Sequence, residues 1–436
     1  MSAQSLSPRA RYAVLLTAVV GLLFDGVELG LMPVASLSVS QSLLWDAFTP
    51  TLGGDWFARF TAALMLGAAV GGIFLGSLGD RIGRTRALGV SVLFYAVFAG
   101  LGAFAKTQEQ MLVLRFMVGL GVGGVWPNAV ALAAECWPDK SRPIIAGLMG
   151  AALNGGILML SQIARTWHIT PESWRWIFQL AAAPAVLGLL ALTVIPESPL
   201  WLALRRSRLK ESHSIPGGES QSIFTSAATK RSESALRELL RPPLLRLTLI
   251  GILIGSIPMV GAWAASKCMI PWADKVGGAT APGYKAITQG WWALGAVLGS
   301  FTGAQIAAWL GRRRAYAIIS AGAAVLTSLM FLGTAPLQAS FLPIVFAQGF
   351  VATLFFGWLP LYLPELFPTR VRAAGSGIAY NVGRFATALG VLAAGALFAA
   401  MGGSYPKVGA TCGLIYLLGV IVIWWAPETT NKKLDD

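Results

Sequence analysis

The feature of this sequence that most constrains its fold is a series of apolar stretches long enough to cross a lipid bilayer. A helix that spans the hydrocarbon core needs about 20 mainly apolar residues. Twelve segments approach or exceed that length, near residues 12–35, 57–79, 87–105, 110–134, 143–164, 176–195, 244–270, 287–309, 315–334, 341–363, 375–400 and 408–426. The sequence therefore predicts an all-α membrane protein with twelve transmembrane helices.

The overall composition excludes an ordinary soluble fold. Of the 436 residues, 56% are hydrophobic and only 12% are charged, whereas soluble domains carry about 25% charged residues. A soluble protein this apolar would have too little polar surface to cover its core. The sequence predicts a lipid bilayer as the protein's surroundings and a monomer as its oligomeric state.

The net charge of +14 follows the predicted topology. If both termini are cytoplasmic, only seven of the 33 Lys and Arg residues fall in the external segments and three fall within helices. Basic residues gather on the cytoplasmic side of membrane proteins. The charge therefore predicts cytoplasmic termini in a bacterial inner membrane, and it gives no reason to expect nucleic-acid binding.

The chain contains an internal repeat at an offset of 227–231 residues. Glu135-x-x-Pro-x-x-x-Arg recurs around Glu365, and Asn154-Gly-Gly is echoed by Asn381-Val-Gly. The repeat predicts an N-terminal six-helix bundle at 1–203, a cytoplasmic linker at 204–243 and a C-terminal six-helix bundle at 244–436. Transporters with two such halves bind their small-molecule substrate between them, near the midplane of the membrane.

Four short motifs resemble those of the major facilitator superfamily of secondary transporters. They are GSLGDRIGR at 76–84, RFMVGLGVGG at 115–124, PESPLWL at 196–202 and PELFPTRVR at 364–372. The last two resemble the branch that holds sugar porters, organic-ion transporters, aromatic-acid symporters and synaptic vesicle glycoproteins. The resemblance implies the two-bundle fold, transport by alternating access, and a proton as coupling ion without any cofactor or metal.

Charged residues gather at the predicted cytoplasmic ends of the helices. Arginine forms bidentate pairs with carboxylates, and the resemblance implies a cytoplasmic gate whose ion pairs join the two halves when the transporter faces outward. Alternatively, single members of this set are solvated topology markers. The predicted gate residues are Asp80, Arg81, Arg84, Glu135, Arg142, Glu197, Arg312, Glu365, Arg372 and Glu428.

Two acids lie inside the first apolar segment. Asp25 and Glu28 are three residues apart and so share one face of a helix. A carboxylate within a membrane is costly unless it is paired, hydrated or protonated, which makes both acids candidates for proton coupling. The motif around Arg115 resembles one associated with proton coupling. The alternative for the acids is a structural ion pair with a neighbouring arginine.

A second group of residues is predicted to bind the substrate. Arg384 lies within the eleventh segment and needs an anion, because arginine keeps its charge at any relevant pH. Asp25 is one candidate anion and a substrate carboxylate is another. Lys267 falls late in the seventh segment, where a lysine can also extend to water. The other candidates are Asn381, Tyr380, Trp263, Asn154, Gln162 and Trp126, although Trp and Tyr also serve as interface anchors.

These residues predict proton-coupled symport of a small organic anion, an aromatic or other carboxylate. Three alternatives remain open on the same scaffold: transport of an organic cation bound by Asp25 and Glu28, transport of a sugar, and a non-transporting membrane sensor or receptor. An enzyme is not expected, since no nucleophile–base set is evident and the chain has only two histidines.

Overall fold

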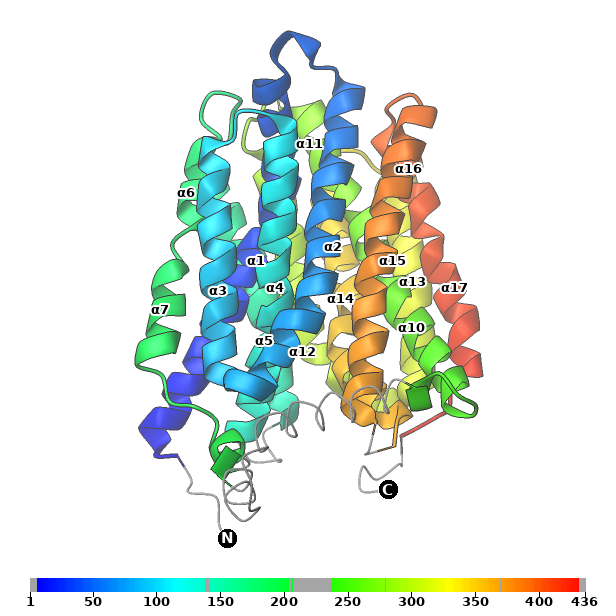
Figure 1. Ribbon diagram of the computed structural model, residues 1–436. Helices are drawn as coiled ribbons and strands as arrows, with labels where there is room; N and C mark the ends of the chain where they lie inside the picture. Colours follow the sequence, from blue (N-terminus) through cyan, green and yellow to red (C-terminus); the bar gives the residue numbers. More distant parts are fainter. Residues whose placement is uncertain are drawn as a thin grey trace.

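The computed structural model describes residues 6–137, 142–203, 205–206, 237–278, 280–368 and 371–430, and it shows a bundle of long helices (Figure 1). Within these residues, twelve helices are long and apolar enough to cross a membrane. The predicted all-α membrane fold is therefore confirmed. Most of the predicted linker at 204–243 lies outside the described residues.

The first six spans come from seven helices. They are α1 (Pro8–Leu44), α2 (Pro50–Ile82), α3 (Arg84–Leu101), α4 (Gln108–Cys136), α5 (Arg142–Thr166), and the pair α6 (Arg175–Ala181) and α7 (Ala185–Thr193), which together form the sixth span. The helix α1 extends beyond the predicted 12–35 at both ends. Its earlier start follows from Ser7, which caps it, and from Pro8 in the first turn, where a proline is tolerated.

The last six spans follow the same plan. The seventh consists of α10 (Leu244–Val260) and α11 (Met269–Gly277). It is followed by α12 (Tyr284–Leu310), α13 (Arg312–Leu332), α14 (Phe341–Leu366) and α15 (Arg372–Ala400), and the twelfth consists of α16 (Tyr405–Gly413) and α17 (Ile415–Val422).

The seventh span is broken, whereas the sequence predicts one uninterrupted segment. A π-helical turn at Gly261–Ala265 and a 3-10 turn at Ser266–Cys268 separate α10 from α11. Pro258 lies just before the break and cannot donate a backbone hydrogen bond to Ile254. The Tyr316 hydroxyl donates to the freed carbonyl of Ile254 at 2.8 Å. Such irregular backbone is tolerated at membrane depth where protein groups satisfy it or where it lines a cavity.

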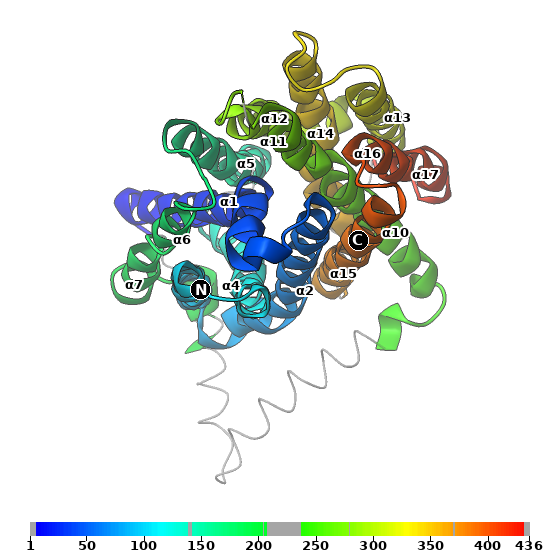
Figure 2. The same ribbon diagram turned by 90° about the horizontal axis from the view of Figure 1, so that it is seen from above.

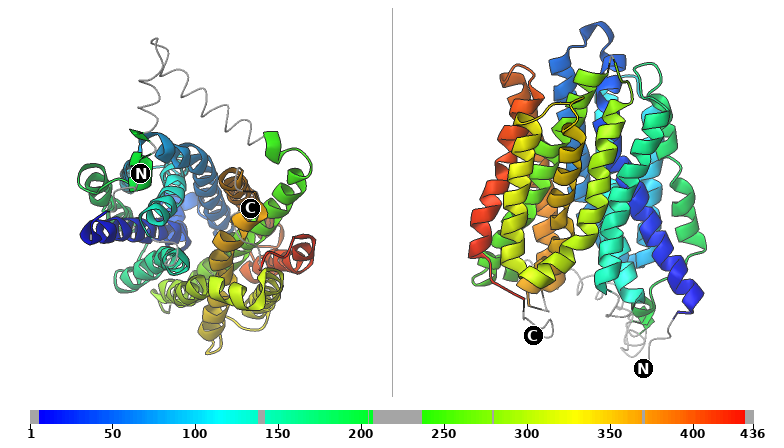
Figure 3. Two further views of the ribbon diagram at one scale, coloured as in Figure 1. Left: turned by 90° about the horizontal axis from the view of Figure 1, so that it is seen from below. Right: turned by 180° about the vertical axis from the view of Figure 1, so that it is seen from behind.

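The two sets of six spans stand side by side when viewed from above and from below (Figures 2 and 3). The described chain begins and ends at the same end of the bundle, which is the lower end in Figure 1. That end also carries the tight turns at Gly83 and Gly311, whose φ angles of 111° and 85° favour glycine. These two turns reverse the chain between α2 and α3 and between α12 and α13.

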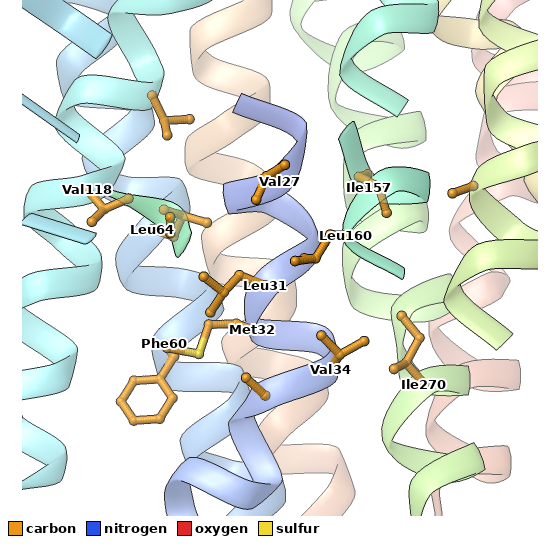
Figure 4. Close-up of a cluster of buried hydrophobic side chains, with 14 of the residues drawn as sticks. Val27, Leu31, Met32, Val34, Phe60, Leu64, Val118, Ile157, Leu160 and Ile270 are labelled. Carbon is orange, nitrogen blue, oxygen red and sulfur yellow. The ribbon is translucent and has the colours of Figure 1, made fainter. Parts of the chain in front are cut away.

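The helix α1 passes through an apolar core. Figure 4 shows its side chains facing those of α2, α4, α5 and α11, with the labelled contacts provided by Val27, Leu31, Met32, Val34, Phe60, Leu64, Val118, Ile157, Leu160 and Ile270. Because these side chains are almost completely buried, α1 is held rigidly on several sides. The polar residues of α1 therefore have fixed positions.

Candidate functional site

A cavity lies between the two halves, lined by residues from both. Three of its lining residues can carry charge: Asp25 from α1, Lys267 from the break before α11, and Arg384 from α15. Aromatic and apolar side chains form most of the remaining wall. A mostly apolar pocket with a few convergent polar groups is the usual form of a small-molecule site.

Close packing of α1 on α5 places Asp25 in this wall. A methyl group on Gly26 would lie 1.8 Å from the carbonyl oxygen of Leu153, and one on Gly156 would lie 1.7 Å from that of Leu23. The two helices can approach this closely only because both positions are glycine. Asp25 is 1% exposed, and its Oδ1 has no hydrogen-bond partner among the described residues.

The second acid of α1 has a different environment. Arg115 of α4 donates from Nη1 to Oε2 of Glu28 at 2.9 Å, and both side chains are 1% exposed. The Arg115 Nη2 group also donates to the backbone carbonyl of Glu28. Glu28 and Arg115 thus form the structural ion pair that was one of the two alternatives for this acid. Neither lines the cavity described above.

Arg384 is partly buried and contacts groups from both halves of the protein. Its Nη1 donates to the Ala68 carbonyl of α2 at 2.9 Å, and its guanidinium lies 5.2 Å from the centre of the Tyr380 ring. In the described part of the chain, no ion pair joins Arg384 to Asp25, which was one of its two candidate anions. Arg384 bonds the neutral carbonyl of Ala68 instead.

The position of Lys267 late in the seventh span left open that its side chain extends to water at the membrane surface. In the structure it does not. It is 1% exposed and lines the cavity, because the π-helical and 3-10 turns redirect the chain there. Its Nζ lies 3.6 Å from the centre of the Trp292 ring and 5.9 Å from that of Trp263. Among the described residues, this Nζ has no hydrogen-bond acceptor.

A chain of hydrogen bonds fixes Trp292 and the broken segment. The Trp292 indole donates to Gln348 Oε1 at 2.8 Å, and Gln348 Nε2 donates to the hydroxyl of Ser266, the residue before Lys267. Sequence reasoning missed Trp292 and Gln348. No local signal distinguished Trp292 from an interface anchor, and Gln348 lies in the tenth span, far from the other candidates in sequence.

Four other predicted binding residues line the cavity, and two do not. Trp126 and Tyr380 are stacked with ring centres 6.4 Å apart, and Trp263 and Asn154 also line the wall. Asn154 donates to the Ser300 hydroxyl across the two halves at 2.8 Å.

The two predicted residues outside the cavity lining are Gln162 and Asn381. Gln162 is exposed and its amide lies beside Gly290 of α12. Asn381 has its amide oxygen against the backbone of Gly72 in α2. Gln162 and Asn381 therefore lie beside α12 and α2, respectively, and not in the cavity wall.

At the lower end, the charged residues of the N-terminal half form one cluster. Arg84 pairs with Glu135 at 3.0 Å and with Asp80, which is 67% exposed, at 2.7 Å. Glu197 accepts from the backbone N–H of Thr85 at the start of α3, where a carboxylate complements the helix dipole. Arg81 is exposed, and the side chain of Arg142 lies outside the described residues.

The C-terminal half repeats this cluster. Arg312 pairs with Glu365 at 2.8 Å, and Glu428 accepts from the backbone N–H groups of Arg312 and Arg313 at the start of α13. Partial burial raises the pKa of Glu428, but the hydrogen bonds from Thr430, Arg313 and Arg312 outweigh it and hold this pKa below its ordinary value. Arg372 begins α15 at the same end.

These ion pairs differ from the predicted gate in one respect. The sequence placed them between the halves, whereas Arg84–Glu135 and Arg312–Glu365 each lie within one half. The turns at Gly83 and Gly311 cause this, because they start α3 and α13 directly beside the carboxylates of α4 and α14. The role of these residues as a gate stays a prediction.

A charged contact does join the halves at the upper end. Lys285, at the start of α12, donates to the Ser38 hydroxyl and the Ile169 carbonyl of the N-terminal half, each at 3.2 Å. The same Nζ pairs with Asp274 of its own half at 3.1 Å, and Lys285 is only 5% exposed. The sequence treated Lys285 only as an external basic residue.

Twelve membrane-length helices around a central cavity between two halves define a membrane transport protein. The sequence matches the family described as "Sugar (and other) transporter" over residues 16–436, and the chain belongs to this family of major facilitator superfamily transporters. It is a transporter and not an enzyme.

Similar proteins include bacterial transporters of organic compounds. The cis,cis-muconate transport protein of Acinetobacter baylyi is 30% identical over 408 residues, which cover 93% of this chain and 92% of that protein. The gentisate transporter of Corynebacterium glutamicum is 26% identical, covering 89% and 82%. The inward-open structure of the xylose transporter XylE from E. coli has a TM-score of 0.72 at 19% identity, with 98% of each chain covered, and this likeness concerns the fold alone.

Proposed function

We propose that this protein carries a small organic carboxylate across the membrane together with a proton, by alternating access. The observation that carries the proposal is the charge of the cavity. Its wall holds two cationic side chains, Lys267 and Arg384, but only one acid, Asp25, and the other acid of α1 is already paired with Arg115. An anionic substrate would balance this excess of positive charge.

The shape and lining of the cavity favour a carboxylate with a flat or conjugated body. Trp126 and Tyr380 stack in one part of the wall, and Trp263 and Trp292 surround Lys267 in another. Aromatic walls bind flat, apolar groups through offset or edge contacts. The similar proteins named for cis,cis-muconate and gentisate transport support the same class of substrate.

Asp25 is the residue we propose to carry the proton. It lines the cavity beside the substrate, whereas Glu28 is held by Arg115. An unpaired carboxylate at this depth is favoured in its protonated form, since a bare charge there is costly. The proton is then the coupling ion, and no cofactor or metal takes part.

The orientation and setting follow from the charge distribution. Bacterial relatives and the basic lower end support a protein of the bacterial inner membrane with both termini in the cytoplasm. We propose that one chain is the functional unit, because the cavity is complete within it.

Uptake by proteoliposomes tests this function. Accumulation of a labelled aromatic carboxylate should require an inward proton gradient and should fall at least tenfold in Arg384→Gln. Asp25→Asn should abolish accumulation driven by the pH gradient, whereas Lys407→Gln, an exposed charge outside the cavity, should behave like the wild type. Uptake that persists in Arg384→Gln, or that needs no proton gradient, would contradict the proposal. An organic cation that needs Glu28 but not Arg384 would favour the cation alternative.

A further inference from the structure

The two cationic residues of the cavity lie at different depths. Lys267 precedes the end of α11 at Gly277 by ten residues, and Arg384 precedes the end of α15 at Ala400 by sixteen. The upper ends of these helices lie near each other, because Lys275 of α11 donates to the Gly403 carbonyl just beyond α15 at 3.2 Å. Since a helix rises about 1.5 Å per residue, Arg384 lies deeper in the bundle than Lys267.

The contacts of these two cations also differ. Arg384 donates to a carbonyl and lies beside Tyr380, so part of its hydrogen-bonding capacity is satisfied by the protein. Lys267 has two aromatic faces and no acceptor among the described residues. A buried ammonium group that lacks an acceptor is unfavourable by several kcal/mol in general. Among the described residues, Lys267 thus has no bonded anion, and Arg384 bonds a neutral carbonyl.

Irregular backbone and a hydrogen-bond network fix the position of Lys267. A π-helical turn and a 3-10 turn replace the regular helix, and Gln348 bonds both Ser266 and Trp292. Single π-helical turns inside α-helices often occur at functional sites. A lysine that only filled space would not require this network around it.

We propose that the substrate is an elongated dicarboxylate, with one carboxylate on Arg384 and the other on Lys267. This inference rests on the proposed function and specifies its substrate class. The apolar or conjugated middle of the molecule lies between the Trp126–Tyr380 pair and the Trp263–Trp292 pair. With Asp25 protonated, the two cations and the dianion leave the loaded cavity without net charge.

A matched pair of ligands tests the inference on purified protein. Muconate and sorbate share a conjugated carbon chain and differ in one terminal carboxylate. Calorimetry should show that the wild type binds muconate at least tenfold more tightly than sorbate. Lys267→Met should weaken muconate binding about 10- to 100-fold, as expected for one charge-assisted hydrogen bond, and should leave sorbate binding unchanged. Lys267→Arg should retain the preference, and Lys275→Met, outside the cavity, should bind both as the wild type does.

Equal affinity of the wild type for the two ligands, or an equal loss of both in Lys267→Met, would overturn the inference. If that variant does not fold, a series of dicarboxylates from malonate to suberate decides the question on the wild type. The series should pass through an optimum in chain length, and a flat series would refute a two-point site. If muconate and sorbate bind equally but both need Arg384, the dicarboxylate inference fails alone. If neither needs Arg384, the proposed function fails.

Discussion

Lys285 joins the two halves at the upper end, and its hydrogen bonds predict how strongly the structure favours keeping the halves together there. Lys285→Met keeps the apolar stem but removes two hydrogen bonds to the N-terminal half, at Ser38 and Ile169. A hydrogen bond from a charged group contributes about 1.5–3 kcal/mol, so the two together contribute about 3 kcal/mol or more. Since about 1.4 kcal/mol is a tenfold change, the open population should rise about 100-fold.

The assay is a distance measurement between spin labels at the upper end. Trp45 and Lys407 are both exposed, lie in different halves and can be replaced by labelled cysteines once the three natural cysteines are removed. Lys285→Met should add a population with a longer distance between the labels. Lys275→Met is the matched control, because Lys275 donates to Gly403 within its own half.

Two results would refute this reasoning. One is an unchanged distance distribution in Lys285→Met, which would mean that apolar packing alone holds the upper end. The other is an equal shift in Lys275→Met, which would mean that any lost charge loosens the bundle. The ion pair with Asp274 lies within one half, so Asp274→Asn should shift the distribution less than Lys285→Met does.

Three further predictions concern stability. Glu28→Gln leaves Arg115 buried without a charged partner, so the melting temperature should fall by the equivalent of about 3–5 kcal/mol, and replacing both residues by Met should recover much of this loss. Gly26→Ala places a methyl group 1.8 Å from the α5 backbone and should yield little monodisperse protein in size-exclusion chromatography, whereas Gly155→Ala, with no atom within 4 Å, should purify normally. The pKa of Glu428 is lower in the folded protein than its ordinary value of 4.5. The stability that Glu428 contributes is therefore present above pH 4.5 and is lost as the pH falls through the lower folded-state pKa. Melting curves of Glu428→Gln should accordingly be less sensitive to acid than those of the wild type.

The sequence predicts the fold well because its signals are local and strong. Membrane-length apolar segments, the positive charge between them and the repeat around Glu135 and Glu365 each need only short stretches of sequence. The break in the seventh span was not predicted. Its cause combines Pro258 with Tyr316, a residue 58 positions away whose hydroxyl satisfies the freed carbonyl, and sequence periodicity contains no such information.

The same holds for the site: the sequence predicts its charged residues, whereas their partners come from distant parts of the chain. Asp25, Lys267 and Arg384 were found because a charge within an apolar segment is visible in the sequence alone. Their partners were not found correctly, since the Ala68 carbonyl bound by Arg384 comes from the other half of the protein. Gln162 was expected in the cavity and does not line it. The sequence alone does not define which face of a helix a residue lies on unless the start of the helix is known accurately. Trp292 was missed because its role depends on the position of Lys267.

The residues that line the cavity show that the two halves of the internal repeat have diverged in sequence. The offset that aligns Asn154 with Asn381 also aligns Ile157 with Arg384, and both of these residues line the same cavity. Identical ancestral halves would have had one residue type at both positions, so the present charge pattern arose after duplication. The acid Asp25 remained or appeared in one copy, and both cations belong to the other. Changes of ligand preference can therefore accumulate in the second copy while the first keeps its own chemistry.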